Sequence, residues 1–167
     1  MVLKFPRLQT DSDEFLHLDA LRIVAAMAIV VFHWGGSHAL WLTERLHLNL
    51  APLAAFVDLF FVISGVVICR VYSSMSTASD YVIFLRKRFA RLAPMHYLTL
   101  GAYVAIGLAA PALGLSLSEP EKYDLACLPA NVAFLQSTMA CPHLSFNFPS
   151  WSISAEMICY LAFPLVL

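Results

Sequence analysis

The chain has 167 residues, of which 60% are apolar and only 13% carry a formal charge, and its mean hydropathy is +0.76. Soluble domains carry about 25% charged residues, so this chain has too few charges to cover a surface that faces water. Much of it is therefore predicted to lie in lipid. The net charge of −1 argues against a nucleic-acid partner, which would require a basic surface.

Residues 1–18 are mixed and partly polar, and they lack the short apolar core and cleavage site of a signal peptide. We predict that they form an N-terminal cytoplasmic segment, followed by a membrane domain over 19–167. The first uncharged stretch, 23–43, is long enough to cross a hydrocarbon core of about 30 Å. We interpret it as a retained transmembrane helix.

Later apolar stretches predict further membrane segments. The stretch 125–155 is rich in proline and asparagine, so it is interpreted as a short or broken segment plus a loop, which either crosses or dips and returns. The fold class predicted is an all-α, polytopic transmembrane bundle with four to five membrane segments. The stretches after the first are 48–69, interrupted by Asp58 in a structural role, 92–118, 125–155 and a final segment from Trp151 to Leu167.

Lysine and arginine residues predict the orientation, because cytoplasmic loops carry an excess of them. They cluster before the first span and between the second and third spans, whereas the loop after the third span is acidic overall. The chain is therefore predicted to be a multi-pass protein of the cell (inner) membrane, with its N-terminus in the cytoplasm. The predicted cytoplasmic side carries Lys4, Arg7 and Arg22 before the first span, and Arg70, Arg86, Lys87, Arg88 and Arg91 between the second and third spans. The predicted outer loops carry Arg45 between the first two spans, and Glu119, Glu121, Lys122 and Asp124 after the third.

The four cysteines show no CxxC spacing, so no metal site is predicted. Cys127 and Cys141 fall on the predicted outer side, where an oxidising compartment permits a disulfide. The interpretation favoured from sequence is that these cysteines are buried, unpaired apolar side chains.

Arg22 and His33 lie eleven residues apart. At 100° per residue they project from one helix face, separated by about 16 Å along the axis. Asp19 precedes Arg22 by three residues and can pair with it. A histidine in the membrane can act as a general base; the alternative is a snorkelling arginine and a structural histidine.

Two further groups of polar residues accompany the apolar segments. Arg88 and Arg91 lie three apart in the basic run 86–91, which suits phosphate binding; the alternative is anchoring against anionic lipid. Ser152, Glu156 and Tyr160 recur every four residues and share a helix face. Glu156 is predicted to pair with a cation such as Arg22, in a functional or purely structural ion pair.

Taken together, four segments resemble motifs of the acyltransferase-three family of membrane enzymes. Each motif alone is weak, but four in the right order make a specific signal. The segments are 18–33, which runs from LDALR to FH, then 57–65 (VDLFFVISG), 84–94 (FLRKRFARLAP) and 149–156 (PSWSISAE), with Tyr160 and Pro164 beyond it.

The resemblance implies transfer of an acetyl or other acyl group from acyl-coenzyme A to a hydroxyl of a carbohydrate, such as a cell-surface polysaccharide. Arg22 and His33 match the family's essential R-x10-H pair, and Glu156 matches an acidic residue that we add as the third catalytic candidate. Arg88 and Arg91 match a cytoplasmic R-x-x-R that holds the donor. His33 would deprotonate the acceptor or accept the acyl group itself.

Family members are roughly twice as long, so the chain is expected to represent the N-terminal half of the family's domain. The alternative function is therefore a truncated, inactive remnant or a non-enzymatic membrane protein. An electron carrier with His33 and His96 as haem ligands is disfavoured, because the two residues are predicted at different depths.

Overall fold

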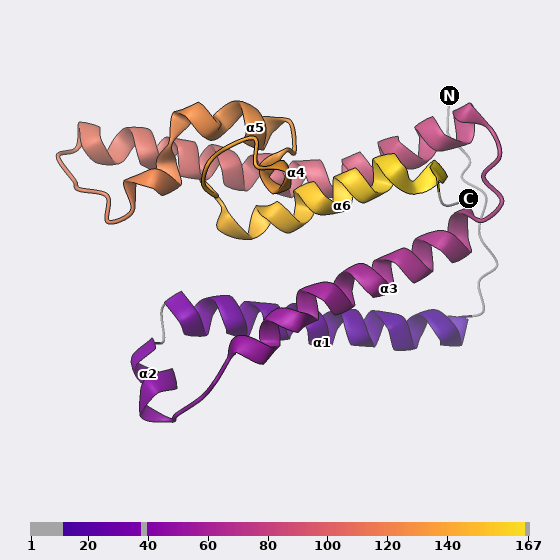
Figure 1. The fold of residues 1–167 in the computed structure, drawn as a ribbon, viewed down its shortest axis with the longest axis horizontal. Helices are drawn as coiled ribbons and strands as arrows, with labels where there is room; N and C mark the ends of the chain where they lie inside the picture. The colour runs from indigo at the N-terminus through magenta and orange to yellow at the C-terminus, as the bar shows by residue number, and fades with distance from the viewer. Residues whose placement is uncertain (1–11, 38–39, 166–167) are drawn as a thin grey trace. The chain divides into compact units, whose positions relative to one another are not determined.

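The computed structural model describes residues 12–37 and 40–165, and every regular element in these ranges is helical. The predicted all-α class is therefore confirmed for this part of the chain (Figure 1). In these ranges, three helices are long and apolar enough to cross a membrane: His17–Gly35, Ala51–Tyr72 and Ala78–Ala112. The chain divides into two compact units, Met1–Ser73 and Ser74–Leu167.

The first unit is built from helix α1 (Ser12–Ser37) and helix α3 (Ala55–Tyr72), which pack against each other (Figure 1). They are joined by helix α2 (Leu40–Arg45) and the 3-10 turn η1 (Ala51–Ala54). The predicted first span, 23–43, thus extends beyond the C-terminal end of the helix that forms it, because α1 ends at Ser37.

Asp58, which interrupts the second predicted span, lies in the first turn of α3 and is exposed. A carboxylate at this position interacts favourably with the partial positive charge of the helix N-terminus. The structural role predicted for Asp58 stays a prediction.

The second unit is organised around helix α4 (Ala78–Ala112), whose 35 residues extend about 52 Å. It begins at a capping box, in which the Thr77 side chain accepts from the Asp80 backbone N–H and the Asp80 side chain accepts from that of Thr77. The basic run 86–91 and the apolar span therefore belong to one continuous helix. The predicted span, 92–118, ends early because Gly114 adopts a left-handed conformation (φ 70°) just after the helix.

The segment after α4 contains short helices and turns. The longest of them, α5 (Leu128–Val132), has five residues, and a helix of that length rises about 7.5 Å. A bilayer core is about 30 Å thick, so this segment contains no membrane-crossing helix, and the broken form of the sequence interpretation is the one observed. The 3-10 turns are η2 (Pro120–Tyr123), η3 (Leu125–Cys127), η4 (Gln136–Thr138) and η5 (Phe148–Ser150).

Helix α6 (Trp151–Ala162), followed by the turn η6 (Phe163–Leu165), packs along α4 (Figure 1). The side chain of Phe84 is fully buried in this contact, with ring centroids 5.7 Å from Tyr160 and 5.3 Å from Phe163. The Tyr81 hydroxyl donates to the Leu161 carbonyl at 2.9 Å. These contacts set the position of the polar residues on α6 against those on α4.

Candidate functional site

Arg22 and His33 lie on one uninterrupted helix, α1. The eleven-residue spacing therefore translates directly into one helix face and a separation of about 16 Å along the axis. Both side chains are partly buried in the first unit.

His33 is held by a local hydrogen bond, in which its Nδ1 lies 2.9 Å from the Ile29 carbonyl oxygen. A carbonyl only accepts, so Nδ1 carries the hydrogen. The neutral imidazole then has its lone pair on Nε2. The Phe32 ring meets the imidazole edge-on, with centroids 5.2 Å apart. This tautomer suits a residue that takes up a proton at Nε2.

Arg22 pairs with Asp19, at 3.3 Å between Nη1 and Oδ1, one helical turn away. This is one of the two partners that the sequence suggested for Arg22. The other, Glu156, lies in the second unit, and its pairing with Arg22 stays a prediction. Among the described residues, the buried Nε of Arg22 has no hydrogen-bond partner.

Arg88 and Arg91 occupy the first half of α4. Arg91 is exposed, whereas Arg88 is partly buried and its guanidinium lies 5.5 Å from the ring centroid of Phe84 and 5.6 Å from that of Tyr160. Both distances are within the range of a cation–π interaction. The structure therefore places Arg88 against α6.

Glu156 is partly buried on α6 and accepts a hydrogen bond from the Tyr160 hydroxyl. The four-residue spacing had predicted only that the two side chains share a helix face. The sequence did not reveal that Arg88 stacks on the same tyrosine, because 72 positions separate the two residues and no local pattern joins them. Ser152, the third residue of the predicted face, donates instead to the Pro149 carbonyl at 2.9 Å.

His96 is a buried polar residue of α4 that sequence reasoning considered only as a haem ligand. Its Nε2 lies 2.9 Å from the Asn131 carbonyl oxygen and therefore carries the hydrogen. His96 thus links α4 to the segment after it. The nitrogen that makes this bond, Nε2, is the one that a haem-ligating histidine would need for the iron. Its side chain is 1% exposed.

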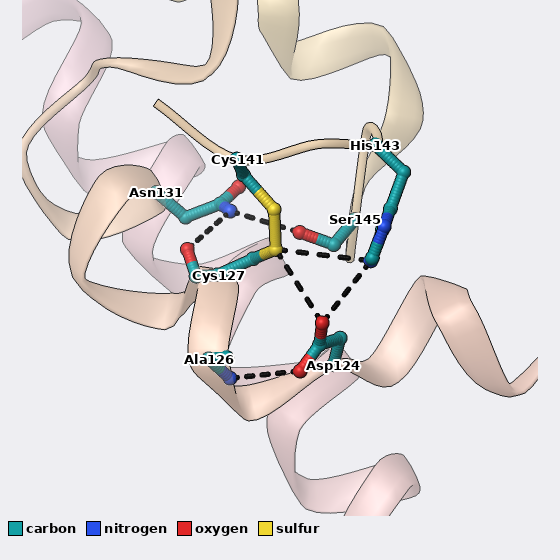
Figure 2. Close-up of a disulfide and its surroundings, with 7 residues drawn as sticks. All are labelled: Asp124, Ala126, Cys127, Asn131, Cys141, His143 and Ser145. Atoms are coloured by element: carbon teal, nitrogen blue, oxygen red, sulfur yellow. Dashed lines mark hydrogen bonds and ion pairs between the residues drawn. A yellow bond between two sulfur atoms is a disulfide. The ribbon is translucent and has the colours of Figure 1, made fainter. Parts of the chain in front are cut away.

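Cys127 and Cys141 form a disulfide, with Cα atoms 5.5 Å apart, a usual separation for such a bond (Figure 2). The interpretation favoured from sequence, two unpaired thiols, is wrong for this pair. The reason is tertiary: the chain turns back within 14 residues and brings both side chains to one place. The observed bond is the other possibility that the sequence had offered.

Hydrogen bonds and an ion pair surround the disulfide, as Figure 2 shows. The Asp124 carboxylate lies 3.2 Å from His143 Nε2 and accepts from the Ala126 backbone N–H at 2.9 Å. The Asn131 amide donates to the Cys127 carbonyl at 2.9 Å and to the Ser145 hydroxyl at 3.2 Å. The donor atoms of Cys127, Cys141 and His143 lie within 4.8 Å of one another, but the disulfide uses both sulfurs, so this group is structural in the state described.

Comparison with known proteins places these features in a family. The acyltransferase domain family matches residues 15–167, nearly the whole chain. The chain belongs to this acyltransferase family. The family suggested by the four sequence motifs is therefore confirmed, and the match includes every candidate site residue.

Two curated relatives resemble this acyltransferase-family chain. An acyltransferase named MdmB from Streptomyces mycarofaciens is 32% identical over 127 residues, which cover 74% of this chain and 30% of that protein. A protein named protein 2 in picA locus, from Rhizobium radiobacter, is 28% identical over 165 residues, which cover 90% of this chain and 81% of that protein. The chain thus spans less than a third of MdmB. No solved structure matches it significantly.

Proposed function

We propose that this protein is an integral membrane O-acyltransferase that moves an acetyl or other acyl group from acyl-coenzyme A to a carbohydrate hydroxyl. The observation that carries the proposal is that His33 lies on a helix long enough to span a membrane and that its Nδ1 lies against the Ile29 carbonyl, which in a neutral imidazole leaves the lone pair on Nε2. Membership of the acyltransferase family supports acyl transfer. The four motifs support the donor and the class of acceptor.

The proposed reaction is a direct transfer. The acceptor oxygen attacks the thioester carbonyl while His33 Nε2 takes the hydroxyl proton. A new C–O ester bond forms, the C–S bond breaks, and the proton passes from His33 to the departing thiolate of coenzyme A. General-base catalysis of this kind contributes about 10²–10⁴-fold to a rate.

The charged donor is proposed to bind at the basic end of α4, where Arg88 and Arg91 face its phosphates. Arg22 lies about 16 Å along α1 from His33, farther than an arginine side chain reaches. We therefore propose that Arg22 does not contact the reacting atoms directly.

The same arrangement supports the proposed orientation in the cell (inner) membrane. Disulfides persist in oxidising compartments, and the Cys127–Cys141 bond follows the end of α4 that is opposite to the basic run 86–91. Placing the disulfide outside puts the basic run inside, as positive-inside charge bias requires. Counting back over the two preceding spans puts the N-terminus in the cytoplasm.

The test is His33→Ala in the full chain, assayed in membranes with radiolabelled acetyl-coenzyme A. We expect label transfer to membrane glycans and release of coenzyme A thiol to fall at least a hundredfold. The matched control is His17→Ala, an exposed histidine on the same helix, which should keep wild-type rates. Full activity of His33→Ala would refute the catalytic role.

Donor binding separates an enzyme from an inactive remnant. Arg88→Gln/Arg91→Gln should lose most binding of radiolabelled acetyl-coenzyme A to membranes. Arg86→Gln/Lys87→Gln removes the same charge from the same helix and should retain it. Equal losses in both pairs would indicate simple anchoring against lipid, and no binding by the wild-type chain would favour the remnant.

A further inference from the structure

We propose that Tyr160 is a positioning residue that joins the donor-binding Arg88 to Glu156, so that both charged groups are held by one side chain. The inference rests on the proposed acyl transfer and goes beyond it, because neither the motifs nor the proposed chemistry gives Tyr160 a role. It is carried by contacts between α4 and α6 within the second unit.

The ring of Tyr160 supports Arg88. The guanidinium carbon lies 5.6 Å from the centroid of this ring and 5.5 Å from that of Phe84, and the two rings meet edge-to-face at 5.7 Å. Tyr160 is 3% exposed and Phe84 is fully buried. Because packing fixes both rings, they define a surface on which the guanidinium is held in one position.

The hydroxyl of Tyr160 engages Glu156, to which it donates a hydrogen bond across one turn of α6. A hydrogen bond to an ionised carboxylate is stronger than one between neutral groups. Tyr160 therefore contacts two residues of opposite charge with two different parts of its side chain. The hydroxyl orients the carboxylate, and the ring orients the guanidinium.

These two contacts give Tyr160 a function beyond packing. A guanidinium that is already ordered loses less freedom when it binds phosphate, so donor affinity rises. A carboxylate held by one hydrogen bond keeps one orientation during turnover. Loss of the ring should therefore weaken donor binding, whereas loss of the hydroxyl alone should slow turnover at saturating donor.

Two substitutions in the full chain separate these effects. Tyr160→Phe removes the hydroxyl and keeps the ring, so the apparent KM for acetyl-coenzyme A should stay within twofold while kcat falls about tenfold, the usual consequence of losing a hydrogen bond to a charged group. Tyr160→Leu also removes the ring, so KM should rise about three- to tenfold in addition.

The matched control is Tyr81→Phe. The Tyr81 hydroxyl also links α4 to α6, through the Leu161 carbonyl at 2.9 Å, but it contacts neither charged group. Both kinetic constants should stay within twofold of wild type. Equal effects of Tyr81→Phe and Tyr160→Phe would show that Tyr160 only holds the helices together, and a wild-type kcat for Tyr160→Phe would also overturn the proposal.

Binding of radiolabelled acetyl-coenzyme A supplies a readout that does not need turnover. If Tyr160 acts through Arg88, then Tyr160→Leu should weaken binding in the wild-type background and add little in an Arg88→Ala background. Additive losses would refute the link. Should His33→Ala remain active, the proposed function fails; should it be inactive while Tyr160→Phe behaves as wild type, only the role of Tyr160 fails.

Discussion

The two units of this protein hold their polar residues in different ways. In the first unit, Arg22 pairs with Asp19 three residues away and His33 with the Ile29 carbonyl four residues away. In the second, several polar side chains also bond across long stretches of sequence. His96 reaches Asn131 over 35 positions, Asn147 reaches Thr99 over 48, and Tyr81 reaches Leu161 over 80.

A polar group in an apolar environment costs free energy unless it is hydrogen-bonded, and the bonds described above meet this requirement either locally or over long distances in the sequence. A local bond within a helix forms with the helix itself and leaves the position of the helix open. A long-range bond also fixes one segment against another. The second unit should therefore depend strongly on its polar and covalent links for stability.

The disulfide gives the largest expected difference. Cys127→Ala/Cys141→Ala should lower the free energy of unfolding by about 3 kcal/mol, the value for a closed loop of this length. The measurement is thermal unfolding of the detergent-solubilised protein. The control is Cys69→Ala/Cys159→Ala, which removes two exposed free cysteines and should change stability little; an equal loss in both would contradict a structural disulfide.

Asn131→Ala tests the buried bonds beside the disulfide. This substitution removes both hydrogen bonds of the side-chain amide, to the Cys127 carbonyl and the Ser145 hydroxyl, and should cost about 2 kcal/mol. The counterpart in the first unit is Asn49→Ala, which removes an exposed side chain that accepts from the nearby Ala51 N–H and should cost about 0.5 kcal/mol. Similar costs at the two sites would remove the contrast between the units.

Asp19→Ala should have a similarly small effect on stability. Its carboxylate is 61% exposed and pairs with Arg22 on the same helix, so the expected loss is about 0.5 kcal/mol. Asp124→Ala, by contrast, removes an N–H acceptor and the His143 contact and should cost about 1–2 kcal/mol. A larger loss at Asp19 than at Asp124 would reverse the comparison.

Much of the fold was predictable because its signals are local. Uncharged stretches located the three long helices of the described residues, and the spacing of Glu156 and Tyr160 predicted that they share a face of α6. Helix ends were less accurate: Ser37 and Gly114 end helices that an apolar pattern alone would extend. Hydropathy reports on the environment of a residue, whereas a helix end depends on backbone conformation.

The candidate site, too, was predictable only where its signals are local. The motifs identified His33, Arg22, Arg88, Arg91 and Glu156, since each lies at a fixed spacing from its neighbours. They did not predict the stacking of Arg88 on Tyr160. Residues 72 positions apart meet there only because α6 packs along α4.

The amino-acid sequence by itself determined that this protein is an α-helical membrane protein of the acyltransferase family. Lipid selects long apolar helices, and helical periodicity fixes which side chains share a face. Only the tertiary structure decided that Cys127 bonds to Cys141, that His96 is held by Asn131, and that Tyr160 contacts both Arg88 and Glu156. Those contacts close long loops of chain, and only packing decides which distant residues meet.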